Sequence, residues 1–253
     1  MKKFWKFQAK SKDKAELEIY GDISDTTWYG DEVTPKQFKK DLDALGDVKE
    51  IDLYINSGGG DVFAGQAIYS MLKRHDAKIT VHVDGLAASI ASVIAMAGDR
   101  ILIPQGSMMM VHEGMIGLLG FFYGKRLRQF AEEIDKITDS VIVPAYGRTG
   151  KTEEEIRKLL SEETWMSAED AVELGFADEI EEGKSVAASI IGDKLTVNGV
   201  AANLTAFKSI PRAFLGMVQT EPPLPDEPIP IEPEPNEPED SGKDTLLLDI
   251  DLI

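Results

Sequence analysis

A serine and a histidine stand at the ends of two apolar strands that the sequence predicts. Ser89 follows the segment 78–85 (KITVHVDG), where Gly85 is expected to turn the chain, and begins a short apolar helix. His112 ends an apolar strand in 107–113 (SMMMVHE). A serine hydroxyl is a poor nucleophile until a neutral imidazole takes its proton, and a carboxylate must then orient that imidazole. Taken alone, Ser89 is more often a helix cap and His112 more often a structural residue.

A third turn carries three adjacent glycines. They lie within INSGGGD, residues 55–61, directly after a predicted buried strand. Without a Cβ atom these residues can adopt positive φ and present bare N–H groups, which suits the stabilisation of an oxyanion. A tight strand-to-helix turn also favours glycine, so the loop alone is weak support. The three turns together favour the chemistry of a serine peptidase, because they supply a donor loop, a hydroxyl and an imidazole in consecutive units.

Alternating strands and helices must position these turns. Helix starts are predicted at Thr34, Asp61, Thr152 and Ser167, where side chains suited to capping precede apolar residues at helical spacing. The alternation predicts an α/β fold with mainly parallel sheets and crossover helices. The expected strands are 15–23, 50–56, 78–85, 100–103 and 107–113. The expected long helix is 122–146, and one or two small strands are expected within 186–215.

Composition excludes several classes of function. The chain of 253 residues contains no Cys, which excludes disulfides, thiolate metal sites and a cysteine nucleophile, and we expect neither a metal nor a cofactor. The net charge of −18 argues against nucleic acid as the main partner. No apolar run approaches the ~18 residues of a membrane span, and the basic start lacks the apolar stretch of a secretory signal.

Charge and proline content divide the chain. Residues 1–14 hold six Lys and one Asp and are interpreted as a solvated basic N-terminal segment, followed by the peptidase domain at 15–185. A small C-terminal extension is expected at 186–218. Residues 219–253 hold eleven acidic residues and eight of the twelve prolines, so they are predicted to be a disordered, extended tail.

Four ordered motifs resemble the caseinolytic Clp peptidases, which have a crotonase-like fold. The resemblance covers roughly residues 15–182 and implies a serine endopeptidase that needs no cofactor. The motifs are YINSGGGDVFAGQAIYSML (54–72), DGLAASIAS (84–92), MMMVHEG (108–114) and ETWMSAEDAVELGFAD (163–178).

The resemblance assigns roles to individual residues. Ser89 matches the nucleophile and His112 the general base, while Glu163 falls where the family usually has Asp. The oxyanion donors would be the N–H groups of Gly59 and Ile90. The residues implied to bind the substrate backbone or to line its pocket are Gly58, Gly60, Met110, Glu113 and Gly114.

Two departures from the family pattern bear on the site. Gly58 follows Ser57 where the family commonly has proline, which loosens the turn in the unfolded chain. Glu163 is one methylene longer than the usual Asp, although glutamate also serves as the third member of some triads. Glu162 and Asp170 are the alternative carboxylates.

Glu163, the WMSA sequence and the acidic extension resemble most closely the Clp-related proteases of phages and prophages. That resemblance implies ATP-independent cleavage of scaffold or capsid proteins during prohead maturation, in the host cytoplasm or inside proheads. It also implies a homo-oligomeric ring, a heptamer or a stacked double ring, joined through a handle at 122–146, with no nucleic acid or membrane partner. Three alternatives remain: a host-type Clp peptidase that works with a separate unfolding ATPase, an acyl-CoA enzyme of crotonase fold, and an inactive shell component.

Overall fold

The computed structural model describes residues 3–25, 34–182, 188–191, 194–203 and 207. They belong to one compact unit, Met1–Val218. The predicted disordered tail at 219–253 lies outside the described residues.

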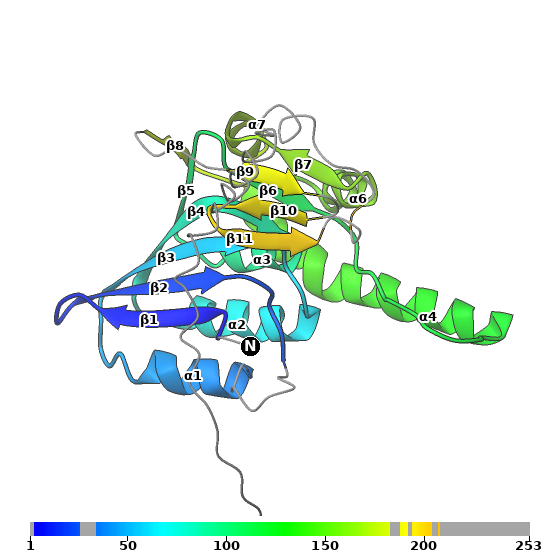
Figure 1. The fold of residues 1–253 in the computed structure, drawn as a ribbon, viewed down its shortest axis with the longest axis horizontal. Helices are drawn as coiled ribbons and strands as arrows, with labels where there is room; N and C mark the ends of the chain where they lie inside the picture. Colours follow the sequence, from blue (N-terminus) through cyan, green and yellow to red (C-terminus); the bar gives the residue numbers. More distant parts are fainter. Residues whose placement is uncertain (1–2, 26–33, 183–187, 192–193, 204–206, 208–253) are drawn as a thin grey trace, which may run out of the picture. The chain divides into compact units, whose positions relative to one another are not determined.

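One sheet of eight strands organises the unit (Figure 1). Its main path runs β1-β2-β3-β4-β5-β8, while β6 pairs with β4 and β7 pairs with β6. Every pair is parallel except β1 with β2 and β6 with β7. The predicted α/β class with a mainly parallel sheet is therefore confirmed. The strands are β1 (Trp5–Ala9), β2 (Lys14–Tyr20), β3 (Glu50–Ser57), β4 (Lys78–Ala88), β5 (Arg100–Pro104), β6 (Met108–Val111), β7 (Thr164–Met166) and β8 (Glu179–Glu181).

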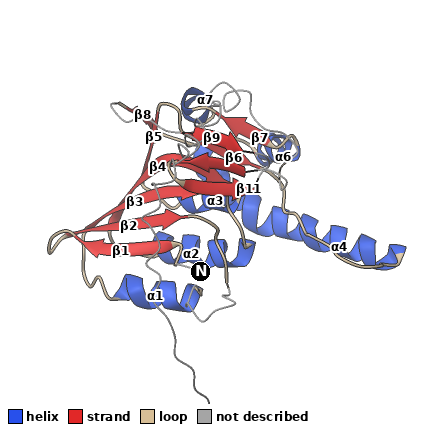
Figure 2. Cartoon of the chain, in the orientation of Figure 1, coloured by secondary structure: helices blue, strands red, loops and turns tan. Residues whose placement is uncertain are grey.

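Helices connect successive strands of the sheet (Figure 2), and four of them begin where the sequence predicts caps. Thr34 accepts a hydrogen bond from the N–H of Gln37, and Asp61 accepts one from the N–H of Ala64. Thr152 and Ser167 each form a full capping box. The helices are α1 (Pro35–Asp43), α2 (Val62–Lys73), α3 (Ile90–Ala95), α4 (Gly124–Ile137), α5 (Val143–Ala145), α6 (Glu153–Ser161) and α7 (Ala168–Glu173).

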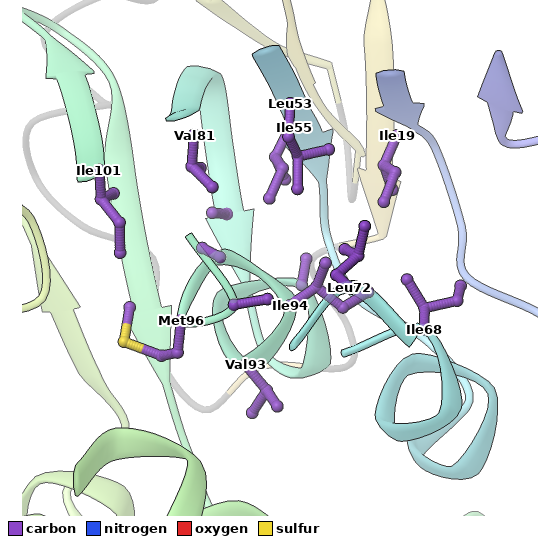
Figure 3. Close-up of a cluster of buried hydrophobic side chains, with 14 of the residues drawn as sticks. Ile19, Leu53, Ile55, Ile68, Leu72, Val81, Val93, Ile94, Met96 and Ile101 are labelled. Carbon is purple, nitrogen blue, oxygen red and sulfur yellow. The ribbon is translucent and has the colours of Figure 1, made fainter. Parts of the chain in front are cut away.

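The main core lies between the sheet and the helices α2 and α3 (Figure 3). Alternate residues of the strands, such as Leu53 and Val81, point toward Leu72 of α2 and Ile94 of α3. All four side chains are buried. Because side chains alternate along each strand, one face of the sheet is apolar and packs on the helices. This packing fixes the positions of the strand ends that carry the candidate site.

The structure corrects the interpretation of Gly85 as a turn. Gly85 lies inside β4, which continues to Ala88, and its φ is 146°. At this point β4 changes partner, from β5 at His82 to β6 at Leu86. A Cβ atom on Gly85 would lie 2.5 Å from Cγ1 of Val197. The glycine therefore allows a bend and a close approach of another strand.

The structure also corrects the interpretation of residues 1–14 as a solvated segment. β1 pairs along its whole length with β2, and Trp5 is buried against Phe38 of α1. The Trp5 Nε1–H donates to Asp41 at 2.9 Å, and Lys6 pairs with Glu18 across the two strands. Aromatic burial outweighs the local charge, which remains on the solvent side.

The predicted continuous helix 122–146 is interrupted. α4 ends at Ile137, and π, α and 3₁₀ turns follow over Thr138–Thr149. Pro144 has no N–H for a helical bond, which accounts for the irregular turns. α4 projects from the body (Figure 1), and each of its residues is at least partly exposed. Among the described residues, no helix is both long and apolar enough for a membrane span.

Within 188–191, 194–197 and 200–203 the described residues form a second sheet, with three antiparallel strands rather than the one or two expected. Leu195 and Val197 of the middle strand are buried against Leu86 and Met110 of the main sheet. The Asn56 side chain donates to the carbonyl of Val197 at 2.7 Å. The small sheet thus packs on the face of β4 and β6 opposite the helices. Its strands are β9 (Ala188–Ile191), β10 (Lys194–Val197) and β11 (Val200–Asn203).

Candidate active site

Ser89 occupies a sharp turn between β4 and α3. Its φ of 54° and ψ of −131° are unusual for a residue with a side chain, and such strain persists only where surrounding contacts enforce it. The Ser89 N–H donates to the carbonyl of Met110 at 2.9 Å. Its carbonyl accepts the Ser92 hydroxyl, which shares a 2.8 Å hydrogen bond with the Tyr146 hydroxyl. The Ser89 side chain makes no capping bond to α3, unlike the alternative that the sequence suggested.

His112 meets Ser89 across the parallel pair formed by β4 and β6. Ala88 lies opposite Met110, so the residues that follow these two strand positions emerge side by side. His112 Nε2 lies 2.8 Å from Ser89 Oγ, a hydrogen-bonding distance. The structure therefore brings together the two side chains that the sequence singled out.

The other histidines make contacts of a different kind. His75 Nδ1 accepts the N–H of Ala77 at a helix end. His82 stacks on Tyr54 and lies 3.2 Å from a carboxylate oxygen of Glu181.

Glu163 lies immediately before β7, the antiparallel partner of β6. Thr164 pairs with Val111 at the end of this ladder, and Glu163 and His112 are the residues that directly flank that last pair. Glu163 is only 5% exposed and has a φ of 52°. The alternative carboxylates differ: Glu162 is exposed, and Asp170 is exposed and caps its own helix at Ser167.

The glycine loop packs directly on the Ser89 turn. Gly59 has a φ of 101°, and a Cβ atom there would lie 2.7 Å from Cβ of Ser89. Its N–H donates to Ser57 Oγ at 3.1 Å, and that hydroxyl donates to the carbonyl of Gly21. The expected oxyanion donor at Gly59 is thus already hydrogen-bonded in the structure, because the Ser57 hydroxyl lies within the same loop.

Gly60 is held from one side by a parallel bridge to Ile23. The bridge uses the carbonyl of Gly59 and the N–H of Asp61, at 2.8 Å each. In such a bridge the N–H of the central residue points to the opposite side from its partner. Since Gly60 also lines the site cavity, its N–H is a second candidate donor in this loop.

A cavity of about 200 Å³ opens over Ser89. Met110 is absent from its lining, contrary to the expectation for a pocket residue, because its side chain is fully buried in the smaller core cluster. The N–H of Gly114 donates to Thr138 Oγ1 at 3.0 Å. The predicted residues that line the cavity are Gly58, Gly59, Gly60, Ser89, Ile90, His112, Glu113 and Gly114.

Sequence reasoning missed the apolar wall of this cavity. Ile142 and Tyr146 come from the irregular turns after α4, and Phe207 comes from beyond β11. Burial raises the pKa of Tyr146 above its usual range, so its hydroxyl stays neutral beside Ser92. No spacing or period in the sequence links these residues to Ser89. The lining residues that were not predicted are Asp22, Val62, Val93, Met115, Ile142, Tyr146 and Phe207.

Comparison with known proteins places the chain in a family. A family model described as Clp protease matches residues 31–184, more than half of the chain. A protein of Deinococcus radiodurans is 32% identical over 142 residues, which are 55% of this chain and 68% of that protein. A protein of Porphyromonas gingivalis is 33% identical over 142 residues, 55% of this chain and 63% of that protein. One from Streptococcus equi subsp. equi is 35% identical over 149 residues, 58% and 76% of the two chains.

Each of these three relatives is named an ATP-dependent Clp protease proteolytic subunit. The chain belongs to the Clp protease family. The resemblance inferred from the four motifs is therefore confirmed at the level of the family.

Proposed function

We propose that this protein is a serine endopeptidase in which Ser89 is the nucleophile, His112 the general base and Glu163 the orienting carboxylate. The observation that carries the proposal is the 2.8 Å contact between Ser89 Oγ and His112 Nε2, on a strained turn that faces a cavity. Glu163 is supported by its burial and by the register of β6 and β7. Its carboxylate would fix the imidazole tautomer and stabilise the imidazolium that forms during the reaction.

The reaction then follows from these positions. Ser89 Oγ attacks the scissile carbonyl as its proton passes to His112 Nε2, and a tetrahedral oxyanion forms. The imidazolium gives that proton to the leaving amine, the carbon–nitrogen bond breaks, and an acyl-enzyme remains. Water, deprotonated by His112, attacks the ester, and the carboxylic acid leaves as Ser89 recovers its proton.

The oxyanion donors would come from α3 and from the glycine loop. Ile90 is the first residue of α3, where N–H groups have no partner within the helix. In the loop, Gly59 and Gly60 are both candidates. We favour Gly60, because the Gly59 N–H donates to Ser57 Oγ and the Gly60 N–H faces away from Ile23. Each such donor is worth about 10²–10³ in rate.

The substrate would be an extended polypeptide. Gly58 of the glycine loop and Glu113 of the segment after β6 line the same cavity as Ser89, and their backbone would bind the substrate backbone. The buried apolar side chains of Ile142 and Tyr146 suit an apolar residue next to the scissile bond. This pocket replaces the one that the sequence placed at Met110.

We further propose assembly into a homo-oligomeric ring through α4 and the segment before it. Leu119, Phe121 and Tyr123 are almost fully exposed, and no residue of α4 is buried by the part of the chain that the structure describes. Exposed aromatic and aliphatic side chains in such a group are typical of protein–protein contacts. A second copy would cover them, as a handle between rings requires.

For the biological role we propose ATP-independent cleavage of scaffold or capsid proteins during phage prohead maturation, in the cytoplasm of the host cell. Support comes from the glutamate at position 163 and from the chain beyond residue 184, where the family match ends. The second candidate is degradation coupled to a separate unfolding ATPase, and the names of the relatives favour it. An acyl-CoA enzyme would need no contact between Ser89 and His112, and an inactive shell component would need no such site.

The test is hydrolysis of an unstructured protein such as casein by the purified chain, with and without ATP and a Clp unfoldase. We expect cleavage without either addition, and none by a folded Ser89→Ala variant. Cleavage of casein by Ser89→Ala at the wild-type rate would refute the nucleophile. Degradation of a folded substrate only in the presence of the unfoldase and ATP would favour the second candidate.

A further inference from the structure

The small C-terminal sheet brings a residue to the active site from outside the part of the chain that matches the family. That match ends at residue 184, whereas β9 begins at Ala188. β10 is fixed on the main sheet by the buried side chains of Leu195 and Val197. The Asn198 side chain adds a 2.6 Å hydrogen bond to the carbonyl of Asp84 in β4. The sheet is thus anchored on β4, the strand that leads directly to Ser89.

Phe207 follows this sheet in the chain and lines the cavity over Ser89. Its ring is half-buried and packs edge-on against Trp165, with 5.4 Å between ring centroids and 83° between planes. It also lies edge-on to the imidazole of His112, at 6.3 Å and 90°. Trp165 belongs to β7 and lies two residues after Glu163. Phe207 therefore stands on the imidazole side of the cavity and presents an apolar surface to it.

We propose that Phe207 is a specificity-determining residue that selects an apolar side chain at the residue following the scissile bond. The inference rests on the proposed function, in which His112 gives its proton to the leaving amine. The residue that follows the scissile bond must lie on that side of the site. An apolar side chain there would be buried against the Phe207 ring, whereas a polar one would lose water without gaining a hydrogen bond. The substrate class is an unfolded peptide with Leu, Met or Phe after the cleaved bond.

The experiment compares two fluorogenic peptides that differ only after the scissile bond, one with Leu and one with Asn. These side chains are similar in size and differ in polarity. In Phe207→Ala we expect kcat/KM for the Leu peptide to fall about tenfold, and that for the Asn peptide to change less than twofold. Phe207→Leu should keep most of the wild-type preference. The matched control is Phe63→Ala, which removes a ring that is 64% exposed on α2 and does not line the cavity.

Labelling by a fluorophosphonate separates this inference from the proposed function. The probe carries no residue after the reacting centre, so Phe207→Ala should be labelled at Ser89 at the wild-type rate. Normal labelling with an unchanged Leu-to-Asn ratio would overturn the inference alone. No labelling of the wild-type protein would overturn the proposed function, and the inference with it. If Phe207→Ala does not fold, Phe207→Gln replaces it with the same expected fall, and an unchanged ratio there would equally overturn the inference.

Discussion

Gly59 offers a sharp perturbation, because it touches the Ser89 turn without belonging to the reacting side chains. A Cβ atom at this position would lie 2.7 Å from Cβ of Ser89 and 2.9 Å from the carbonyl oxygen of Ala88. Contacts this short do not persist, so Gly59→Ala must move the glycine loop or the Ser89 turn. The φ of 101° adds backbone strain for any residue with a side chain.

The displacement sets the expected magnitude. Two carbon atoms rest about 3.5–4.0 Å apart, so relief of the 2.7 Å contact requires a shift of about 1 Å. A misplacement of about 1 Å at a reacting centre costs about 10²-fold in rate, which corresponds to about 2.7 kcal/mol of transition-state stabilisation. Separately, the strained backbone should lower the free energy of unfolding by about 1–3 kcal/mol.

The assay measures kcat/KM for a fluorogenic peptide together with the rate of fluorophosphonate labelling, on protein shown to be folded. Gly59→Ala should lose about 100-fold in both. Two matched variants separate the steric contact from the backbone strain. At Gly46 an added Cβ atom meets nothing within 4 Å but φ is positive, and at Gly147 there is neither a contact nor a positive φ. Gly46→Ala should lose stability and keep activity, and Gly147→Ala should keep both. A folded Gly59→Ala protein with wild-type labelling would refute the packing argument.

Three further predictions concern groups around the site and the N-terminal strand. Glu163→Gln should lower kcat about 10⁴-fold in steady-state kinetics, and Glu162→Gln should leave kcat unchanged. The reverse pattern would show that Glu162, not Glu163, orients His112. Tyr146→Phe should lower the free energy of unfolding by about 1 kcal/mol, measured with urea, since its hydroxyl bonds Ser92; no change would contradict this. Burial opposes ionisation of Asp41, but hydrogen bonds from neighbouring side chains outweigh it and lower its pKa. The ionised Asp41 carboxylate therefore adds to the free energy of unfolding above about pH 4, and this contribution is lost as the pH falls through the lowered pKa. The difference in free energy of unfolding between wild type and Asp41→Asn, measured with urea, should therefore become smaller in acid. A difference that stays constant with pH would contradict the stabilising role of this carboxylate.

The site could be predicted in large part because its turns are encoded locally. Ser89, His112 and the glycine loop each directly follow an apolar strand, and the carboxyl ends of neighbouring parallel strands meet at one edge of a sheet. Their proximity therefore follows from the topology. The burial of Glu163, in contrast, depends on the antiparallel pairing of β7 with β6, which only the motif resemblance indicated.

The misread positions share a different cause, since long-range packing decided them. Gly85 has the local pattern of a turn, but Val197 of the C-terminal sheet packs on it and the strand continues. The lysines near the N-terminus indicate a solvated segment, yet Trp5 is buried against Phe38. Phe207 lines the cavity and follows a sheet whose strands are only weakly indicated by the sequence pattern. Local residue propensities cannot predict these contacts, because each joins residues far apart in the sequence.

The central claim is that the fold gives one hydroxyl, that of Ser89, the reactivity of a nucleophile through His112. Mass-spectrometric mapping of the fluorophosphonate adduct on native protein tests it most directly. The account predicts a single adduct on Ser89, which does not form when the protein is denatured before the probe is added and forms at least about 10³-fold more slowly in His112→Ala. An adduct on Ser57 or Ser92 instead, or equal labelling of the native and His112→Ala proteins, would contradict it.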